Sequence, residues 1–335
     1  MHSTLTHPHS HPTPPTARGE THCGDQCNAG DVQALLSYGF QSVKLDGCGD
    51  QHNTSLFASL FNASGTPVLI ENCHDEQQPQ APIAEGGCPD YHTYRTSTDI
   101  RNTYGSWLLN AYSVERYAST GRSGPTCWGY PDMLMIGVGS TCAGDTCAEG
   151  ESAPLPSLTE QVSHYGLWCI LSSPLTLSMD FANASLVDAV WPTVTNVHAL
   201  AVNQQWAGRP GGQLALPPGT DNVTLQHCTP GWAGDLPCSV PRTQGWWKPL
   251  PAAAGAVLFL NNDPEQQQQV TVDLAGLGAA IGLPCAPTCG VFDVWAQAEL
   301  GTRTGSYTAT LQPHQSLFHV LHVPGVPWEG GEAAQ

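Results

Sequence analysis

Two hydrophobic periodicities alternate along the first 210 residues of the chain. Short apolar runs of the kind that form buried strands lie at residues 41–47, 67–72, 92–100, 131–137 and 174–180. Apolar positions at helical spacing predict helices at residues 30–40, 52–65, 100–120, 158–173 and 185–202. Strands that alternate with helices in this way are typical of βαβ units, so the pattern predicts a parallel sheet.

Polar residues and glycines mark the expected ends of these elements. Asp31 is placed to cap the first helix, which Gly39 ends, and Gly65 closes the second helix. Thr159, followed directly by a glutamate and a glutamine, is the expected cap of the fourth helix. The third strand is expected to end near Asp99.

The pattern changes after about residue 210, where short strands separated by turn residues remain. These strands are expected at residues 256–262, 268–274, 290–296, 304–312 and 316–323, and no helical pattern lies between them. This arrangement predicts an antiparallel β-sandwich.

The predicted fold class is therefore α/β, a partial TIM (β/α)8 barrel followed by a C-terminal antiparallel β-sandwich. Five strands either form an open sheet or are the last five of a full barrel, which needs about 250 residues. We expect a disordered low-complexity tail at 1–22, a partial barrel at 23–209 and a sandwich domain at 210–330.

Charge narrows the choice of ligand. The chain of 335 residues carries 10 Lys and Arg against 28 Asp and Glu, a formal net charge of −18. Polyanions would be repelled, which argues against nucleic acid and anionic membrane surfaces as partners. No apolar stretch reaches the ~18 residues of a membrane span. A neutral ligand such as a sugar is compatible with this balance, and so is acidity that serves only solubility.

The 13 cysteines point to an oxidising compartment. Several lie close together without a CxxC pair, so disulfides are favoured over a zinc site, and no metal or cofactor is expected. Four Asn-X-Ser/Thr sequons agree with secretion. Residues 1–20 nevertheless lack the apolar core of a signal peptide. We therefore expect the natural start to be absent from this sequence or replaced.

Asp46 and Asp99 are the candidate catalytic residues, because each comes where a buried parallel strand is expected to end. In barrels of this kind the carboxyl ends of the strands form the active site, and two carboxylates brought together there suit glycoside hydrolysis. The alternative is that each aspartate only caps a loop or turn.

Five segments then resemble a known family. YGFQSVKLDGCG, YRTSTDI, WGYPDML, LWCILSSPLTLSMD and LAVNQQWAG are similar, in this order, to the motifs of glycoside hydrolase family 27, which holds α-galactosidases and α-N-acetylgalactosaminidases. CAPTC, VFDVW and the segment up to residue 323 resemble its C-terminal sandwich. The resemblance covers about residues 23–325.

The resemblance implies a retaining α-galactosidase that acts on α-galactoside oligosaccharides or glycoconjugates. Asp46 matches the family nucleophile, and Asp99 matches the acid/base. The two carboxyls of a retaining enzyme stand about 5–5.5 Å apart. Lys44 and Arg95 match cationic residues that contact sugar hydroxyls. The oligomeric state is left open.

Three further substrate-binding candidates have two interpretations each. Asp132 either contacts sugar or holds a strand or loop end. Trp128 packs on the sugar or in the core. Glu71 and His74 lie in IENCHDEQ, which stands where the family has its sugar-selecting loop but differs from the usual sequence, and Glu71 is equally explained as a rim carboxylate. Tyr130 stands where the family commonly has an aspartate.

The resemblance also implies disulfides. Cys48 would pair with Cys23 or Cys27, Cys73 with Cys88 would clamp the loop after the second strand, and Cys285 would pair with Cys289.

The family has three further barrel strands before residue 23, with a tryptophan and two consecutive aspartates that hold galactose. Residues 1–22 are not expected to supply them. A secreted or lysosomal/vacuolar enzyme is implied, with its signal peptide missing. The alternatives are a related glycosidase for N-acetylgalactosamine or arabinopyranosides, and an inactive, poorly soluble sugar-binding relic with open sheet edges.

Overall fold

The computed structural model describes residues 3–4, 25–46, 53–73, 78–88, 90–140, 153–229, 235–328 and 330. The chain divides into two units, the first Met1–Thr96 with Thr120–Gly129 and the second Ser97–Ser119 with Tyr130–Gln335. Each unit is described by itself. None of the helices in the described ranges has the length and apolar character needed to cross a membrane.

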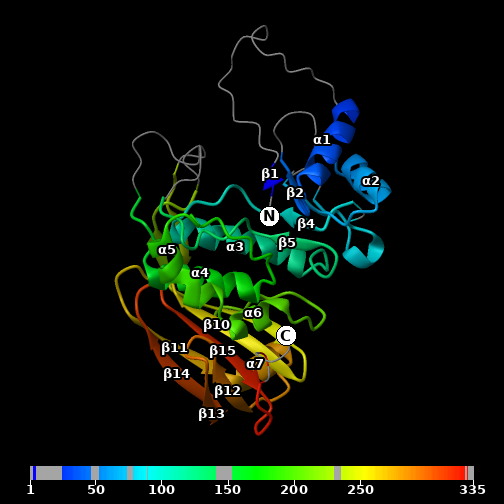
Figure 1. Cartoon of the computed structure of the whole chain (residues 1–335). Coiled ribbons are helices and arrows are strands. Elements are labelled where there is room, and N and C mark those ends of the chain that lie inside the picture. Colours follow the sequence, from blue (N-terminus) through cyan, green and yellow to red (C-terminus); the bar gives the residue numbers. More distant parts are fainter. Residues whose placement is uncertain are drawn as a thin grey trace. The chain divides into compact units, whose positions relative to one another are not determined.

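The first unit is built on a parallel sheet with strand order β1-β2-β3-β4-β5 (Figure 1). Its strands are β1 Ser3–Thr4, β2 Ser42–Leu45, β3 Leu69–Asn72, β4 Thr93–Arg95 and β5 Trp128–Tyr130, the last of which ends at the start of the second unit. Its helices are α1 Asp25–Ser37, α2 Thr54–Ser64 and the short 3-10 helix η2 Ile83–Glu85. Two residues of the segment 1–22, for which no regular structure was expected, thus form β1.

Local signals placed several of these elements correctly. Helix α2 begins after Asn53, whose side chain accepts a hydrogen bond from Leu56 N, and it ends at Gly65 with φ +72°. Only glycine adopts this left-handed conformation without strain, so the predicted end of α2 is confirmed. Helix α1 ends as expected before Gly39 but begins at Asp25, so the prediction of a cap at Asp31 is wrong.

The helices of the second unit are α3 Tyr104–Ala118, α4 Leu158–Ile170, α5 Ala184–Val194, α6 Val197–Gln204 and α7 Leu274–Ile281. The cap of α4 is Ser157, whose hydroxyl accepts from Glu160 N while the Glu160 carboxylate accepts from Ser157 N. The prediction of Thr159 as the cap is therefore wrong by two positions. Helix α7 also corrects the expectation that the sandwich region contains no helix.

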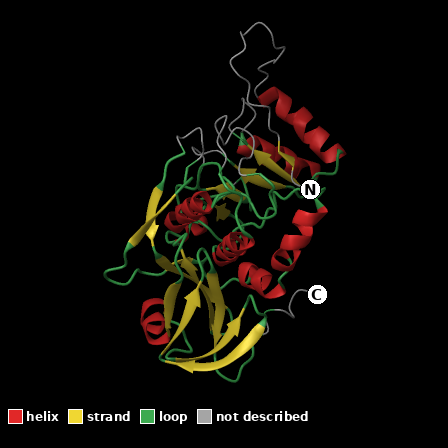
Figure 2. Ribbon diagram, turned by 90° about the vertical axis from the view of Figure 1, so that its left-hand side faces the viewer, coloured by secondary structure: helices red, strands yellow, loops and turns green. Residues whose placement is uncertain are grey.

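The sandwich strands of the second unit form a six-stranded antiparallel sheet, β13-β12-β15-β10-β9-β6, and two-stranded sheets β11-β14 and β7-β8 (Figure 2). Their bounds are β6 Gly212–Gln213, β7 Asn222–Leu225, β8 Cys238–Pro241, β9 Thr243–Leu250, β10 Ala254–Asn261, β11 Gln268–Asp273, β12 Thr288–Asp293, β13 Ala298–Thr304, β14 Ser306–Leu311 and β15 Ser316–His322. The predicted antiparallel sandwich is confirmed.

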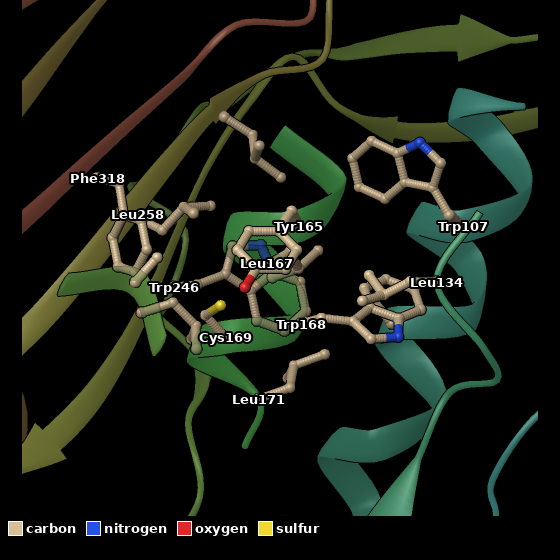
Figure 3. Close-up of a cluster of buried hydrophobic side chains, with 14 of the residues drawn as sticks. Trp107, Leu134, Tyr165, Leu167, Trp168, Cys169, Leu171, Trp246, Leu258 and Phe318 are labelled. Carbon is tan, nitrogen blue, oxygen red and sulfur yellow. The ribbon is translucent and has the colours of Figure 1, made fainter. Parts of the chain in front are cut away.

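The central strands of this sheet are buried on both faces. Leu258 and Phe318 join the core that includes Trp107 of α3 and Trp168 of α4, whereas Val257 belongs to the core under β11 and β14. Successive side chains of a strand point to opposite faces, so β10 contributes to both cores. Figure 3 shows α4 between α3 and the sandwich strands, with its side chains filling the space on both sides.

Two of the predicted strands do not form. The segments 131–137 and 174–180 share one parallel bridge, Leu134 with Leu177, and the strand next to β4 is Trp128–Tyr130 instead. Asp132 has φ +115°, far from extended backbone, which accounts for the interruption just after β5. The third strand also ends earlier than predicted, at Arg95 rather than near Asp99.

Candidate active site

Asp46 directly follows β2, as predicted, and it lies beside a buried cation. The Lys44 Nζ is 3.8 Å from Asp46 Oδ2 and 3.9 Å from Glu71 Oε1. The side chains of Lys44 and Glu71 are 6% and 3% exposed, and that of Asp46 is 26% exposed. One ammonium therefore stands between a buried and a more accessible carboxylate, at the carboxyl end of the parallel strands.

The register of the sheet explains this grouping. Lys44 of β2 is aligned with Glu71 of β3, which is aligned with Thr93 of β4. Alternate residues of a strand share a face, so Asp46 lies on the face of Lys44 and Arg95 on the face of Thr93. The sheet thus places two cationic and two anionic positions on one face near the strand ends.

The backbone of Arg95 is fixed at the end of β4 by Gln78, whose Nε2 donates to Arg95 O at 2.7 Å. Trp128 begins β5, donates its backbone N–H to His92 O at 2.9 Å and is partly exposed. A Cβ on the next residue, Gly129, would lie 2.8 Å from the Tyr94 hydroxyl oxygen. A glycine is therefore required where β5 approaches β4.

A disulfide joins Cys88 to Cys127, directly before Trp128. This corrects the expectation that Cys88 pairs with Cys73. The predicted Cys285–Cys289 disulfide is present, and a Cys228–Cys238 disulfide accompanies it. Cys27 is disulfide-bonded, while Cys23 and Cys48 lie outside the described residues, as does His74.

Asp99 belongs to the second unit, in a loop four residues beyond the end of β4, and it is partly exposed. The residue after it, Ile100, donates its N–H to Asp132 Oδ2 at 3.1 Å. The other oxygen, Asp132 Oδ1, accepts from Met133 N at 2.7 Å. Asp132 is 4% exposed. These contacts favour the interpretation in which Asp132 holds a loop over the one in which it contacts sugar.

Asn110 is a polar residue of this region that sequence reasoning missed. It lies inside α3, is 4% exposed, and donates from Nδ2 to Thr98 O, the residue before Asp99. The signal available in the sequence was an asparagine in the interior of a helix, where its propensity is poor. Tyr130, noted for its departure from the family pattern, is buried. Within the described ranges no group of three or more His, Cys, Asp or Glu side chains forms a candidate metal site.

Comparisons with known proteins find a matching domain and several relatives. Residues 241–321 match the alpha galactosidase C-terminal beta sandwich domain. A probable alpha-galactosidase of Dictyostelium discoideum is 26% identical over 88% of this chain and 66% of its own length. The chain thus spans slightly less than two thirds of that relative, and 62% of alpha-galactosidase 2 of Arabidopsis thaliana, to which it is 22% identical.

Solved structures share the fold. Alpha-galactosidase I from Mortierella vinacea superposes with a TM-score of 0.65 at 16% identity, over 90% of this chain and 72% of that one. A family 27 β-L-arabinopyranosidase from Geobacillus stearothermophilus gives 0.63 at 18% identity, over 90% of this chain and 62% of that one. The sandwich domain, the curated relatives and the fold thus all make the chain similar to proteins of glycoside hydrolase family 27.

Proposed function

We propose that the chain is a retaining glycosidase that removes terminal α-linked galactose, with Asp46 as nucleophile and Asp99 as acid/base. The observation that carries the proposal is the position of Asp46: an accessible carboxylate at the end of β2, 3.8 Å from the buried ammonium of Lys44. The resemblance of the motifs around Asp46 and Asp99 to family 27, and the alpha-galactosidases among the relatives, supply the substrate class.

The reaction proceeds by two displacements. In the first, Asp46 Oδ attacks the anomeric carbon, the bond to the leaving oxygen breaks, and the proton of the Asp99 carboxyl passes to that oxygen. In the second, Asp99 takes a proton from water, the water oxygen attacks the anomeric carbon, and the ester bond to Asp46 breaks. Galactose leaves with its configuration retained.

Lys44, Glu71 and Arg95 are proposed to bind the sugar. Their face of the sheet carries both donors and acceptors, which a sugar hydroxyl can use together. Trp128 supplies an apolar surface beside them, and Asp132 acts by holding its loop.

We also propose that the chain divides near residues 22 and 209 into a tail, a partial barrel domain and a sandwich domain. The disulfides support a secreted or lysosomal/vacuolar location.

Hydrolysis of an aryl α-galactoside by the full chain tests the proposal. Asp46→Asn should lower kcat by at least about 10³-fold, because the amide cannot form the glycosyl ester. Asp188→Asn, an exposed aspartate on α5, is the matched control and should keep full activity. A chain that cleaves no α-galactoside, or an Asp46→Asn variant as active as the control, would contradict it.

The sugar itself is tested with a panel of aryl glycosides. Preferred cleavage of the α-galactoside is expected. Preference for an α-N-acetylgalactosaminide or a β-L-arabinopyranoside, with the same loss in Asp46→Asn, would keep the mechanism and replace the substrate. The arabinopyranosidase among the structural neighbours makes that substrate a necessary member of the panel.

A further inference from the structure

The loop that carries Asp99 is held on both sides of that residue. Asn110 Nδ2 donates to Thr98 O at 2.9 Å, and Ile100 N donates to Asp132 Oδ2 at 3.1 Å. The Thr98 carbonyl belongs to the peptide group before the Asp99 Cα, and the Ile100 N–H belongs to the peptide group after it. Since peptide groups are planar, holding both of them fixes the φ and ψ of Asp99.

Asn110 also joins this loop to a second one. Its Nδ2 donates to Pro131 O at 2.9 Å, and the Ser97 hydroxyl donates to the same carbonyl at 2.6 Å. A primary amide nitrogen has two N–H groups, so both donors of Asn110 are used. The two loops are thereby linked through a side chain that comes from α3.

The second loop is anchored in the core from the other side. Trp168 of α4 donates from Nε1 to Asp132 O at 2.9 Å. Asn110, Asp132 and Trp168 are all nearly fully buried. Hydrogen bonds out of reach of water are stronger and hold geometry better than exposed ones. The direction of the Asp99 Cα–Cβ bond is therefore set by groups that lie on, or are held by, two helices.

We propose that Asn110 is a positioning residue for Asp99: it does not touch substrate, but it holds the peptide group from which the acid/base carboxyl projects. The inference rests on the proposed function, because it requires Asp99 to be the acid/base. An error of about 1 Å in the position of a catalytic group costs about 10²-fold in rate. Loss of the two Asn110 donors should therefore slow proton transfer by Asp99 about 10²-fold and leave the attack of Asp46 unchanged.

Leaving-group dependence isolates proton transfer. An α-galactosyl disaccharide has a poor leaving group and needs the acid, whereas dinitrophenolate leaves without a proton. In Asn110→Leu, kcat/KM per active site should fall about 10²-fold on the disaccharide and less than about threefold on the dinitrophenyl galactoside. In Asp99→Ala, which removes the acid/base carboxylate, azide should raise kcat on the dinitrophenyl galactoside and give galactosyl azide, because an anion attacks the glycosyl ester without a general base. Active sites are counted by covalent titration with a fluorinated galactosyl fluoride.

Asn261 offers a matched control. It is a fully buried asparagine on β10 whose Nδ2 donates to Gln266 O and Gln312 O at 2.8 and 2.9 Å. Asn261→Leu should lower stability in a similar way, but kcat/KM per active site should be unchanged on both substrates. Asn110→Ser, which keeps one donor, is the milder variant in case Asn110→Leu does not fold. Its kcat/KM on the disaccharide should fall by less than that of Asn110→Leu.

The outcomes separate the two proposals. Asp99→Ala should show the same selective loss in larger measure, together with the azide response. If Asp99→Ala shows this signature but the soluble Asn110 variants lose nothing, or lose both substrates equally, the inference about Asn110 is overturned and the proposed function stands. If the wild-type chain cleaves neither substrate, or Asp99→Ala shows no leaving-group dependence, the proposed function fails and the inference falls with it.

Discussion

The ammonium of Lys44 lies 3.9 Å from the carboxylate of Glu71, and both side chains are buried at the same level of neighbouring strands. Lys44→Met should destabilise the protein by about 3–5 kcal/mol, because it leaves the buried Glu71 carboxylate without this cation. Urea denaturation monitored by tryptophan fluorescence gives the value.

The double variant Lys44→Met/Glu71→Leu should recover most of that loss, since it removes both charges of the buried ion pair. A single variant within about 0.5 kcal/mol of wild type, in the range of ordinary surface substitutions, would show that the pair is not a structural feature of the sheet.

A second contact makes stability depend on acid pH. Burial raises the pKa of Glu160, but hydrogen bonds from His314, at 2.7 Å, and from Ser157 outweigh it, and the net pKa is lowered. A carboxyl whose pKa is lower in the folded state stabilises the fold above its unfolded pKa, about 4.3, and loses this contribution as pH falls through the folded value.

We therefore expect the melting temperature of wild type to fall below pH ~4.3 more steeply than that of Glu160→Gln. Differential scanning calorimetry between pH 3 and 6 measures both curves. Parallel curves would mean that the His314–Glu160 contact is not maintained in solution.

Lys248 should make the stability of the fold depend on pH in the alkaline range, because its pKa is lowered in the folded state. Its Nζ donates to Asn203 O at 2.7 Å and to Val202 O, at the end of α6, and burial lowers the pKa of Lys248 to about 7. The unfolded chain holds this proton up to pH ~10.4, so between pH 7 and 10 stability should rise with pH by up to about 1.4 kcal/mol per unit.

Lys248→Met removes the titrating group and should remove that slope. The quantity to compare is the difference in unfolding free energy between wild type and Lys248→Met at pH 7 and at pH 9. A difference that does not change with pH would contradict the lowered pKa.

The Cys88–Cys127 disulfide should contribute more than the Cys285–Cys289 disulfide. The first spans 39 residues and the second 4. Loop-closure entropy gives about 4 kcal/mol for the longer loop and about 2 kcal/mol for the shorter. Paired Cys→Ser variants, compared by chemical denaturation, should lose stability in that order. Because Cys127 directly precedes Trp128, a proposed sugar-binding residue, the Cys88→Ser/Cys127→Ser variant should also have a raised KM. The Cys285→Ser/Cys289→Ser variant should not.

The sequence was most informative where one signal decides an element. The buried run before Asp46 and the end of α2 at Gly65 needed no distant partner to be recognised. Helix α7 was missed because it consists of apolar residues and glycines without a polar face. An asparagine inside a helix marks Asn110 as unusual, but its hydrogen bonds could not be predicted from local pattern, since its partners Thr98 and Pro131 lie 12 and 21 residues away in opposite directions.

Covalent labelling tests the assignment of Asp46 most directly. A fluorinated galactosyl fluoride that forms a long-lived glycosyl ester should add one sugar per chain, detected by intact mass, and peptide mapping should place it on Asp46. Asp46→Asn should remain unlabelled, and Asp188→Asn should be labelled like wild type. A label on Asp99, Glu71 or another residue, or an active chain that takes up no label, would contradict Asp46 as the nucleophile.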